Sequence, residues 1–335
     1  MLNGEYRYRY SPFNPLLFLT FNKCFGGTVM EPESTTISAF RPKKTSLFKT
    51  NIKAFTFLLP AIIILLIFFI TPMILTVFFS FTNLSLTGLN AQKLEFIGFD
   101  NFVKMFNDQR LYNSIAKTLV FVLFSAIIGQ CFFGFLIAYL MKGKNAHFRR
   151  IIGICVIAAW VTPEIVAAFC WVAFLGDSGT LNSILTSFSG IKPIAFLFEY
   201  PMICVVVANI WRGTAFSMLT FQAALDDIPA EIEEAAVIDG ASKWKVITHL
   251  ILPILKGAIT TNLMLVTLQT LGVFTLIYTM TGGGPGDRTA TLPIFMYQQA
   301  FVSYQLGYGT AISLVILIIG AIFSFLYMRL LKVKV

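Results

Sequence analysis

Six long apolar runs organise the sequence, and nearly all of its charged residues lie between them. A helix needs about 20 apolar residues to cross the ~30 Å hydrocarbon layer of a membrane. The runs that reach this length are residues 55–80, 117–141, 151–175, 201–225, 257–280 and 308–328. The pattern therefore predicts an all-α integral membrane protein with six transmembrane helices.

Three prolines lie inside these runs, Pro60 and Pro72 in the first and Pro163 in the third. Proline removes a backbone donor and normally disrupts a helix. Inside a membrane, neighbouring helices can satisfy the carbonyl that proline leaves free. We therefore expect a kink at each of these positions and no break in the helix.

Lysine and arginine are concentrated at alternate ends of the apolar runs, which indicates how the chain is oriented. The segment before the first run, the second and fourth loops and the C-terminal tail hold Arg41, Lys43, Lys44, Lys49, Lys53, Lys142, Lys144, Arg149, Arg150, Lys243, Lys245, Lys256, Arg329, Lys332 and Lys334. Loops rich in these residues stay on the cytoplasmic side. Both termini are therefore predicted to be cytoplasmic, with residues 1–54 as a tail and residues 55–335 as the six-span domain.

Composition agrees with a membrane protein and removes several other classes. Hydrophobic residues make up 57% of the chain and charged residues 12%, whereas soluble domains carry about 25% charge. The net charge of +9 lies beside apolar runs, so no nucleic-acid partner is expected. The five cysteines and two histidines form no metal-ligand pattern. Gly143-Lys144 lacks the spacing of a phosphate-binding loop, so any ATP is expected to bind a partner.

The fourth loop, residues 226–256, is the only long cytoplasmic segment between spans, and it predicts two short helices joined by a turn. Pro229 suits the first position of a helix, and the acidic residues after it favour the positive end of the helix dipole. Gly240 can adopt the left-handed conformation that ends a helix, and Ser242 can cap the next one. Such a rigid knob can insert into a groove of a neighbouring protein.

The same loop carries a motif that resembles a known family. Its elements are Glu234-Ala235-Ala236, Gly240 after three residues, and Leu250-Ile251-Leu252-Pro253 after nine more. In order and spacing they resemble the EAA motif of ABC-importer permeases, and Asp239-Gly240-Ala241 with Trp244 narrows the resemblance to sugar permeases of the maltose and multiple-sugar type. The further segments that agree are Phe96–Phe102, Trp211-x-Gly213, Thr281–Gly286 and Tyr308-Gly309. The resemblance covers about residues 55–330.

This resemblance implies a type I ABC-importer permease fold whose EAA helix is the cytoplasmic coupling helix. In the family this helix sits in a cleft of an ATPase subunit, and its glutamate meets a basic residue there. The positions that take this role by resemblance are Glu234, Ala235, Ala236, Asp239, Gly240 and Ala241. A charged helix can also be only a solvated surface, and we favour that interpretation for Glu231 and Glu233.

The resemblance also implies the rest of the importer. The expected partners are a second permease subunit in a heterodimer, two ATPase subunits and an extracytoplasmic solute-binding protein, with membrane lipid around the spans. ATP and magnesium belong on the ATPase, and this chain is expected to hold no cofactor and to catalyse no reaction. The expected location is the inner membrane of a bacterium or archaeon.

Two predicted spans offer polar residues near mid-membrane. Arg212 lies 11 residues after Pro201, about 16 Å along a helix, and charge at that depth usually faces a cavity or an interior. By resemblance to the maltose-type importers, the candidates for sugar contact are Arg212, Gly213, Phe216, Gln269 and Thr270. Two alternatives remain: hydrogen bonds between helices, and an ion pair between Arg212 and Glu164.

The predicted function is that of a permease subunit of an ATP-driven importer for a sugar or oligosaccharide. A substrate such as a glycerol phosphate or a polyol is the alternative within this class. An ion-coupled secondary carrier is the alternative from another class, although such carriers usually show internal repeats and several midplane charges. Dependence of uptake on ATP separates the two classes.

Overall fold

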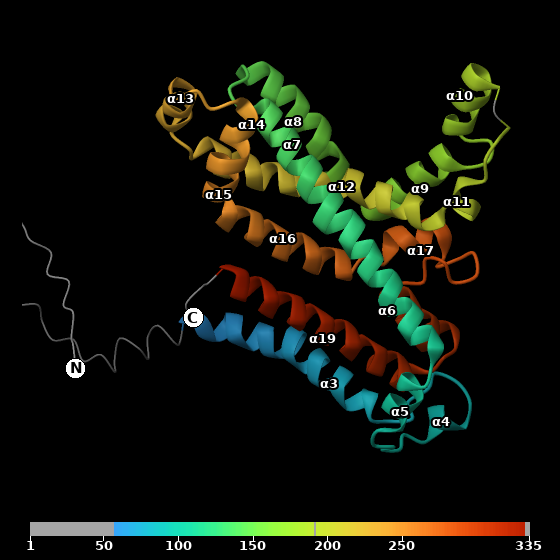
Figure 1. Ribbon diagram of the computed structural model, residues 1–335. Helices are drawn as coiled ribbons and strands as arrows, with labels where there is room; N and C mark the ends of the chain where they lie inside the picture. Colours follow the sequence, from blue (N-terminus) through green and yellow to red (C-terminus); the bar gives the residue numbers. More distant parts are fainter. Residues whose placement is uncertain (1–56, 191, 332–335) are drawn as a thin grey trace, which may run out of the picture. The chain divides into compact units, whose positions relative to one another are not determined.

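The computed structural model describes residues 57–190 and 192–331 (Figure 1). The N-terminal tail expected over residues 1–54 lies outside the described residues. The chain divides after Ile62 into two units, and the contacts given below are those within the unit that begins at Ile63. The described residues contain no strand, only an isolated antiparallel bridge between Thr82 and Phe96.

Helices follow one another along almost the whole of this unit. The α-helices are α3 (Thr71–Ser80), α4 (Leu89–Gln92), α5 (Asp100–Phe106), α6 (Gln109–Phe121), α7 (Cys131–Met141), α8 (Ala146–Val161), α9 (Glu164–Leu175), α10 (Thr180–Ser189), α11 (Phe196–Glu199), α12 (Pro201–Asp226), α13 (Ala230–Ile238), α14 (Lys243–Lys245), α15 (Leu252–Ile254), α16 (Lys256–Leu271), α17 (Thr275–Thr281), α18 (Leu292–Tyr297) and α19 (Leu306–Leu331). The π-helical segments are η1 (Leu66–Ile70), η2 (Val122–Gln130), η3 (Val246–Ile251) and η4 (Gln298–Val302).

Five of the described helices are long and apolar enough to cross a membrane: Phe57–Ser80, Gln109–Met141, Glu164–Phe188, Pro201–Asp226 and Leu306–Leu330. A sixth span is possible where Lys243–Ile254 and Lys256–Leu271 meet at a bend of 71°. Up to six spans are thus present, as expected. The predicted limits of the fifth run, 257–280, are wrong, because α16 ends at Leu271 and a separate helix, α17, starts at Thr275. The predicted limits of the third run, 151–175, are also wrong, because the third span is Glu164–Phe188.

The expectation of a mere kink at Pro163 is also wrong, because the helix breaks there. Thr162 and Pro163 are extended, with ψ of 128° and 137°, between the end of α8 and the start of α9. Proline crowds the residue before it out of helical conformation, so the Thr162-Pro163 pair ends α8. The chain stays helical through Pro72, where the π-helical turns of η1 come immediately before it.

The helices α7 and α12 pack at very close range because small residues lie between them. A Cβ built on Gly134 of α7 would lie 2.3 Å from the Cβ of Ser217, and one on Gly213 of α12 would lie 2.3 Å from the Gln130 side chain. Buried amides reinforce the contact: Gln130 Nε2 donates to the Asn209 carbonyl at 3.1 Å, and Asn209 Nδ2 donates to Ser125 Oγ at 2.9 Å. Membrane helices associate through such small residues and polar bonds.

The two ends of the helical bundle carry different structures. Figure 1 shows α3 and α19 side by side, and α13 to α15 next to the ends of α7 and α12. At the opposite end, α5 and α6 meet α18 and the start of α19 around a buried cluster of Met105, Leu111, Leu292, Phe295, Tyr308, Ala311 and Ile312. The predicted knob therefore lies at one end of the bundle, next to the ends of α7 and α12, and the α5, α6 and α18 cluster lies at the other end.

Candidate functional site

The helix α13 carries the motif, and local sequence signals determine its start. Pro229 has φ −56° and ψ 134° and stands just outside the helix, which begins at Ala230, one residue later than expected. Glu231 and Glu233 lie in the first turn, where negative charge is stabilised by the helix dipole. The acidic positions thus favour this helix independently of any tertiary contact.

The end of α13 is a left-handed glycine turn, as expected. Gly240 has φ +80°, a conformation that residues with a Cβ rarely adopt. Its N–H donates to the Val237 carbonyl and the Ala241 N–H donates to the Ala236 carbonyl, both at 3.0 Å, which is the hydrogen-bond pattern of a Schellman motif. Ser242 Oγ accepts from the Lys245 N–H at 3.4 Å and caps the next helix, which confirms that prediction.

The motif residues divide between an inner and an outer side of α13. Ala236 and Ala241 pack against a buried cluster that includes Met218, Phe221 and Val246. Glu234, Ala235, Asp239 and Gly240 are exposed. Two of the six residues expected to couple to a partner thus pack against this chain itself.

The sequence analysis did not single out Val237 and Ile238, two exposed apolar side chains inside the motif, and it used Trp244 only for the family resemblance. Val237 is 61% exposed, Ile238 85% and Trp244 72%. Exposed apolar side chains that lie close together are typical of surfaces that contact another protein or a membrane. The available signal was the occurrence of Val237, Ile238 and Trp244 within eight positions, on either side of the Gly240 turn.

Two ion pairs tie the motif loop to the hairpin between α7 and α8. Lys142, just after α7, pairs with Glu233 of α13, and both side chains are largely buried. Arg149 of α8 donates to Asp226, the last residue of α12, at 2.5 Å. Glu233 is therefore not the purely solvated residue that the sequence analysis favours, whereas Glu231 is exposed as expected. We name the Lys142–Glu233 and Arg149–Asp226 pairs the hairpin clamp.

We expect Lys142→Glu to loosen α13, because it places a second negative charge beside Glu233 in place of the ion pair. Breaking a fully buried ion pair costs about 3–5 kcal/mol, and breaking this partly exposed pair costs less. Amide hydrogen exchange in α13 should rise at least tenfold. Restoring the pair in reverse, with Lys142→Glu and Glu233→Lys together, should return exchange most of the way. The exposed Lys144→Glu serves as the control. Equal exchange in the single and double variants would contradict a role for this pair.

The five residues proposed for a sugar path do not all face one space. Phe216 packs near Trp160, with ring centroids 6.1 Å apart. The Gln130 side chain fills the space beside Gly213. Thr270 is buried within the chain, with 3% of its surface exposed, whereas Gln269 is exposed. Gln269 is thus the most accessible of these four residues and Thr270 the least, and Phe216 and Gly213 are partly buried.

Arg212 does not form the ion pair with Glu164 that was one alternative. None of the ion pairs in the described residues joins them. The break at Pro163 places Glu164 in the first turn of a new helix, α9, and off the path of α8. Arg212 Nε is buried and has no hydrogen-bond partner in the part of the chain that the structure describes.

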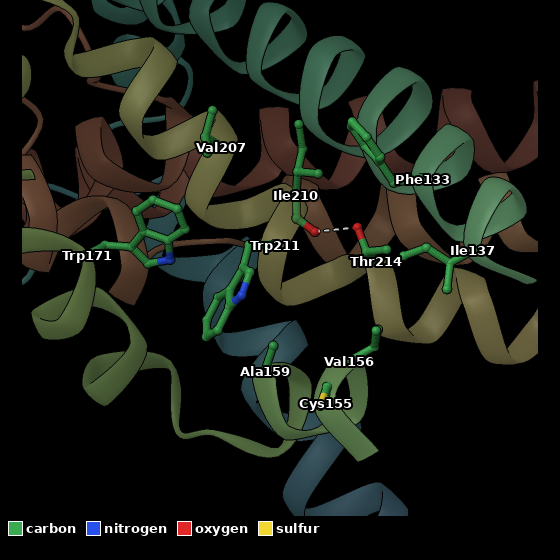
Figure 2. A pocket seen from close by; sticks show the side chains of 10 residues that line it. All are labelled: Phe133, Ile137, Cys155, Val156, Ala159, Trp171, Val207, Ile210, Trp211 and Thr214. Atoms are coloured by element: carbon green, nitrogen blue, oxygen red, sulfur yellow. Dashed lines mark hydrogen bonds between the residues drawn. The ribbon is translucent and has the colours of Figure 1, made fainter. Parts of the chain in front are cut away.

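An apolar cavity of about 480 Å³ lies between α7, α8, α9 and α12 (Figure 2). The Trp171 and Trp211 rings meet edge to face at 6.0 Å on one side of it. The Thr214 hydroxyl is already bonded to the Ile210 carbonyl at 2.6 Å, as the dashed line in Figure 2 shows. Because its lining offers so few free polar groups, this cavity is poorly suited to hold a sugar.

Residues 130–333 match the model of one protein family, the binding-protein-dependent transport system inner membrane component. The match spans the EAA loop, the close α7–α12 contact and the last helix. The chain belongs to this family. It is therefore a permease, a membrane-spanning subunit of a transport system located in the inner membrane.

Characterised relatives resemble the permease over most of their length. The sulfoquinovosyl glycerol transport system permease protein of Agrobacterium fabrum is 32% identical over 284 residues, which cover 83% of this chain and 89% of that protein. The multiple sugar-binding transport system permease protein of Streptococcus mutans is 31% identical, and the match covers 83% of this chain and 94% of that protein. The trehalose/maltose transport system permease protein of Thermococcus litoralis is 29% identical and covers 81% and 91%.

Solved structures give the same fold. A chain of a bacterial alginate ABC transporter, in complex with an alginate pentasaccharide-bound periplasmic protein, matches with a TM-score of 0.73 at 23% identity, covering 86% of the permease and 98% of that chain. A second alginate importer structure matches with a TM-score of 0.71 at 25% identity, covering 84% and 97%. The type I importer fold implied by the motif is confirmed.

Membership in this family also settles the choice between classes. The relatives are permease subunits of binding-protein-dependent systems and not enzymes, so the chain is a transport subunit. An ion-coupled secondary carrier, the alternative from another class, is not supported.

Proposed function

We propose that the permease imports a sugar or oligosaccharide that an extracytoplasmic binding protein delivers, with energy from ATP bound by separate ATPase subunits. The printed names of its relatives, which include sulfoquinovosyl glycerol, multiple sugars and trehalose/maltose, support this substrate class. A second, similar permease subunit, two ATPase subunits and magnesium on the ATPase complete the proposed importer. The proposed orientation places both termini in the cytoplasm.

The observation that carries the proposal is the exposed apolar end of α13 beside the motif. Ile238 and Trp244 are largely exposed next to the acidic Glu234, so a partner that covers them needs an apolar cleft with a basic residue near it. A mobile ATPase subunit with that cleft would pull on α13. The hairpin clamp would carry the movement into α7 and α8, since their ends are ion-paired to the same loop.

Movement of α13 and the hairpin clamp can open and close the substrate path because the helices move as rigid bodies. The α7–α12 contact has no room for sliding, as a Cβ on Gly134 or Gly213 would already clash. Rigid bundles respond to a pull by rotating as bodies between two packings. We propose that this rotation exposes the substrate path to one side of the membrane and then to the other.

The experiment that tests this function uses proteoliposomes that contain the permease with its partner permease and ATPase subunits, supplied with the binding protein outside. We expect uptake of labelled maltose, trehalose or sulfoquinovosyl glycerol that requires ATP inside and stops with vanadate. Uptake that survives ATP depletion would contradict the proposal. Testing the three solutes in parallel identifies the substrate that the binding protein delivers.

We propose that Arg212, Phe216 and Gln269 contact the solute in the path, and we leave out Gly213 and Thr270, which pack within the chain. Arg212→Leu is expected to lower uptake about tenfold, because a hydrogen bond from a charged group is worth about 1.5–3 kcal/mol. The effect should be larger for the sulfonated probe than for maltose. Unchanged uptake and affinity for every probe would remove Arg212 from the path, and Arg329→Leu at the end of α19 is the matched control.

A further inference from the structure

A second cavity, of about 530 Å³, is lined by residues of α6, α17 and η4 and of the turns that follow α17 and η4. In Figure 1, α6 and α17 lie far from α13. The lining residues of this cavity are Arg110, Tyr278, Gly282, Gln298, Val302 and Ser303. Ligand pockets in proteins usually measure about 300–1,000 Å³ and combine apolar rings with a few placed polar groups. Unlike the cavity in Figure 2, this one has both.

The apolar side of this cavity belongs to a continuous group of rings. Tyr278 stacks on Phe274 with centroids 5.2 Å apart and meets Tyr297 edge to face at 5.1 Å. Tyr297 continues to Phe301 at 5.3 Å. Hydrogen bonding with Tyr278 is the main cause that raises the pKa of the Tyr297 phenol. Tyr278 remains 42% exposed, so its ring is held in place while part of it stays open.

The polar side is a hydrogen-bonded cluster centred on Arg110. Its Nη2 donates to Gln298 Oε1 at 2.8 Å, and its Nε donates to Asp287 Oδ2 at 3.2 Å. Nη1 has no partner among the residues that the structure describes, and the Arg110 side chain is 44% exposed. The guanidinium is thus fixed in position with donors to spare. Gln298 and Ser303 add side chains that can both donate and accept.

The position of the ring group along the chain connects it to the proposed path. Phe274 follows Thr270 by four residues, across the break at Gly272 that separates α16 from α17. Tyr278 comes four residues later. The cavity therefore lies close along the chain to Gln269 and Thr270, beyond the end of α16 that is farther from the motif loop.

We propose that this cavity is a carbohydrate subsite, in which a pyranose ring lies against Tyr278 while Arg110 and Gln298 hydrogen-bond its hydroxyls. A sugar ring has an apolar face of C–H groups and a rim of hydroxyls that both donate and accept, and the cavity offers a matching surface for each. Aromatic residues also gather where membrane meets water, but such a belt needs no fixed guanidinium. The inference rests on the sugar import proposed above and adds a point of first contact before the path.

The test is photolabelling of the complete importer in nanodiscs with a diazirine-bearing methyl glucoside, followed by mapping of the labelled peptides. We expect the label in the segments around Tyr278 and Gln298, displaced by excess unlabelled methyl glucoside. Tyr278→Leu should reduce this labelling at least fivefold, and Tyr278→Phe, which keeps the ring, should preserve most of it. Tyr304→Leu is the control, because Tyr304 is similarly exposed at 47% and does not line the cavity.

Labelling that Tyr278→Leu and Tyr304→Leu reduce equally, or that excess glucoside fails to displace, would overturn the subsite. Preferential labelling of the same segments by a photoreactive phospholipid would also overturn it and would indicate a membrane-facing aromatic belt. The label reports occupancy without transport. An importer that takes up no sugar but is labelled at Tyr278 would thus disprove the proposed function alone, and normal uptake with no label would disprove the subsite alone.

Discussion

Replacing Ile238 with glutamate is expected to lower ATP-driven uptake by about 100-fold or more. The side chain is 85% exposed at the end of α13, so the change costs the isolated permease little. Burial of an isoleucine against a partner is worth about 1.5–3 kcal/mol, and an unpaired carboxylate in the same contact costs several kcal/mol more. Each 1.4 kcal/mol is a factor of ten in binding. Co-purification of the ATPase subunits and uptake in proteoliposomes measure the effect.

The control for this prediction is Ala230→Glu, which adds the same charge to the same helix. Ala230 is exposed in the first turn of α13, where the helix dipole stabilises a negative charge. It lies four residues before Glu234, at which the motif begins. This variant should bind the ATPase and transport normally. If the Ile238 variant kept its ATPase subunits and its uptake, the exposed end of α13 would not be the partner surface.

Replacing Gly134 with valine is expected to prevent stable folding of the permease. A Cβ at this position would lie 2.3 Å from the Ser217 Cβ and 2.9 Å from the Met218 backbone nitrogen, so the backbone of α12 itself would have to move. Overpacking of a core typically costs about 1–3 kcal/mol and sometimes more, and here the neighbour is a rigid helix. We expect a melting temperature in detergent at least 8 °C lower, or loss of the protein from the membrane.

Gly153→Val is the matched control, because Gly153 is also inside a helix, α8, and nothing lies within 4 Å of a Cβ built on it. Any general cost of valine in a membrane helix is the same for both variants. A melting temperature that drops equally in the two would show that the α7–α12 contact adapts, and the argument for rigid rotation would lose its basis.

Sequence reasoning found the residues whose conformation is local. Gly240 had to end α13 because only a positive φ closes that turn, and Ser242 had to cap because its hydroxyl reaches the next free N–H. Both follow from neighbouring residues alone. The break at Pro163 was also local, and the error there was to let a rule for membrane helices outweigh the steric effect of proline on Thr162.

The sequence could not predict which face of α13 packs against the rest of the chain. Ala236 and Glu233 stand in the same short helix as Ile238, and periodicity over nine residues does not tell which side meets the protein. Their partners come from distant segments: Lys142 lies 91 residues from Glu233. The ion pair between them depends on how the α7–α8 hairpin packs.

The sequence by itself determined the class of molecule and the place of the loop that carries the motif, because apolar run length and backbone dihedral demands are read from adjacent residues. The tertiary structure alone decided which motif residues remain free for a partner, and it brought Arg110, Tyr278 and Gln298 to one cavity. Side chains separated by 188 residues, as Arg110 and Gln298 are, meet only when helix packing places them together, and no local pattern encodes that distance.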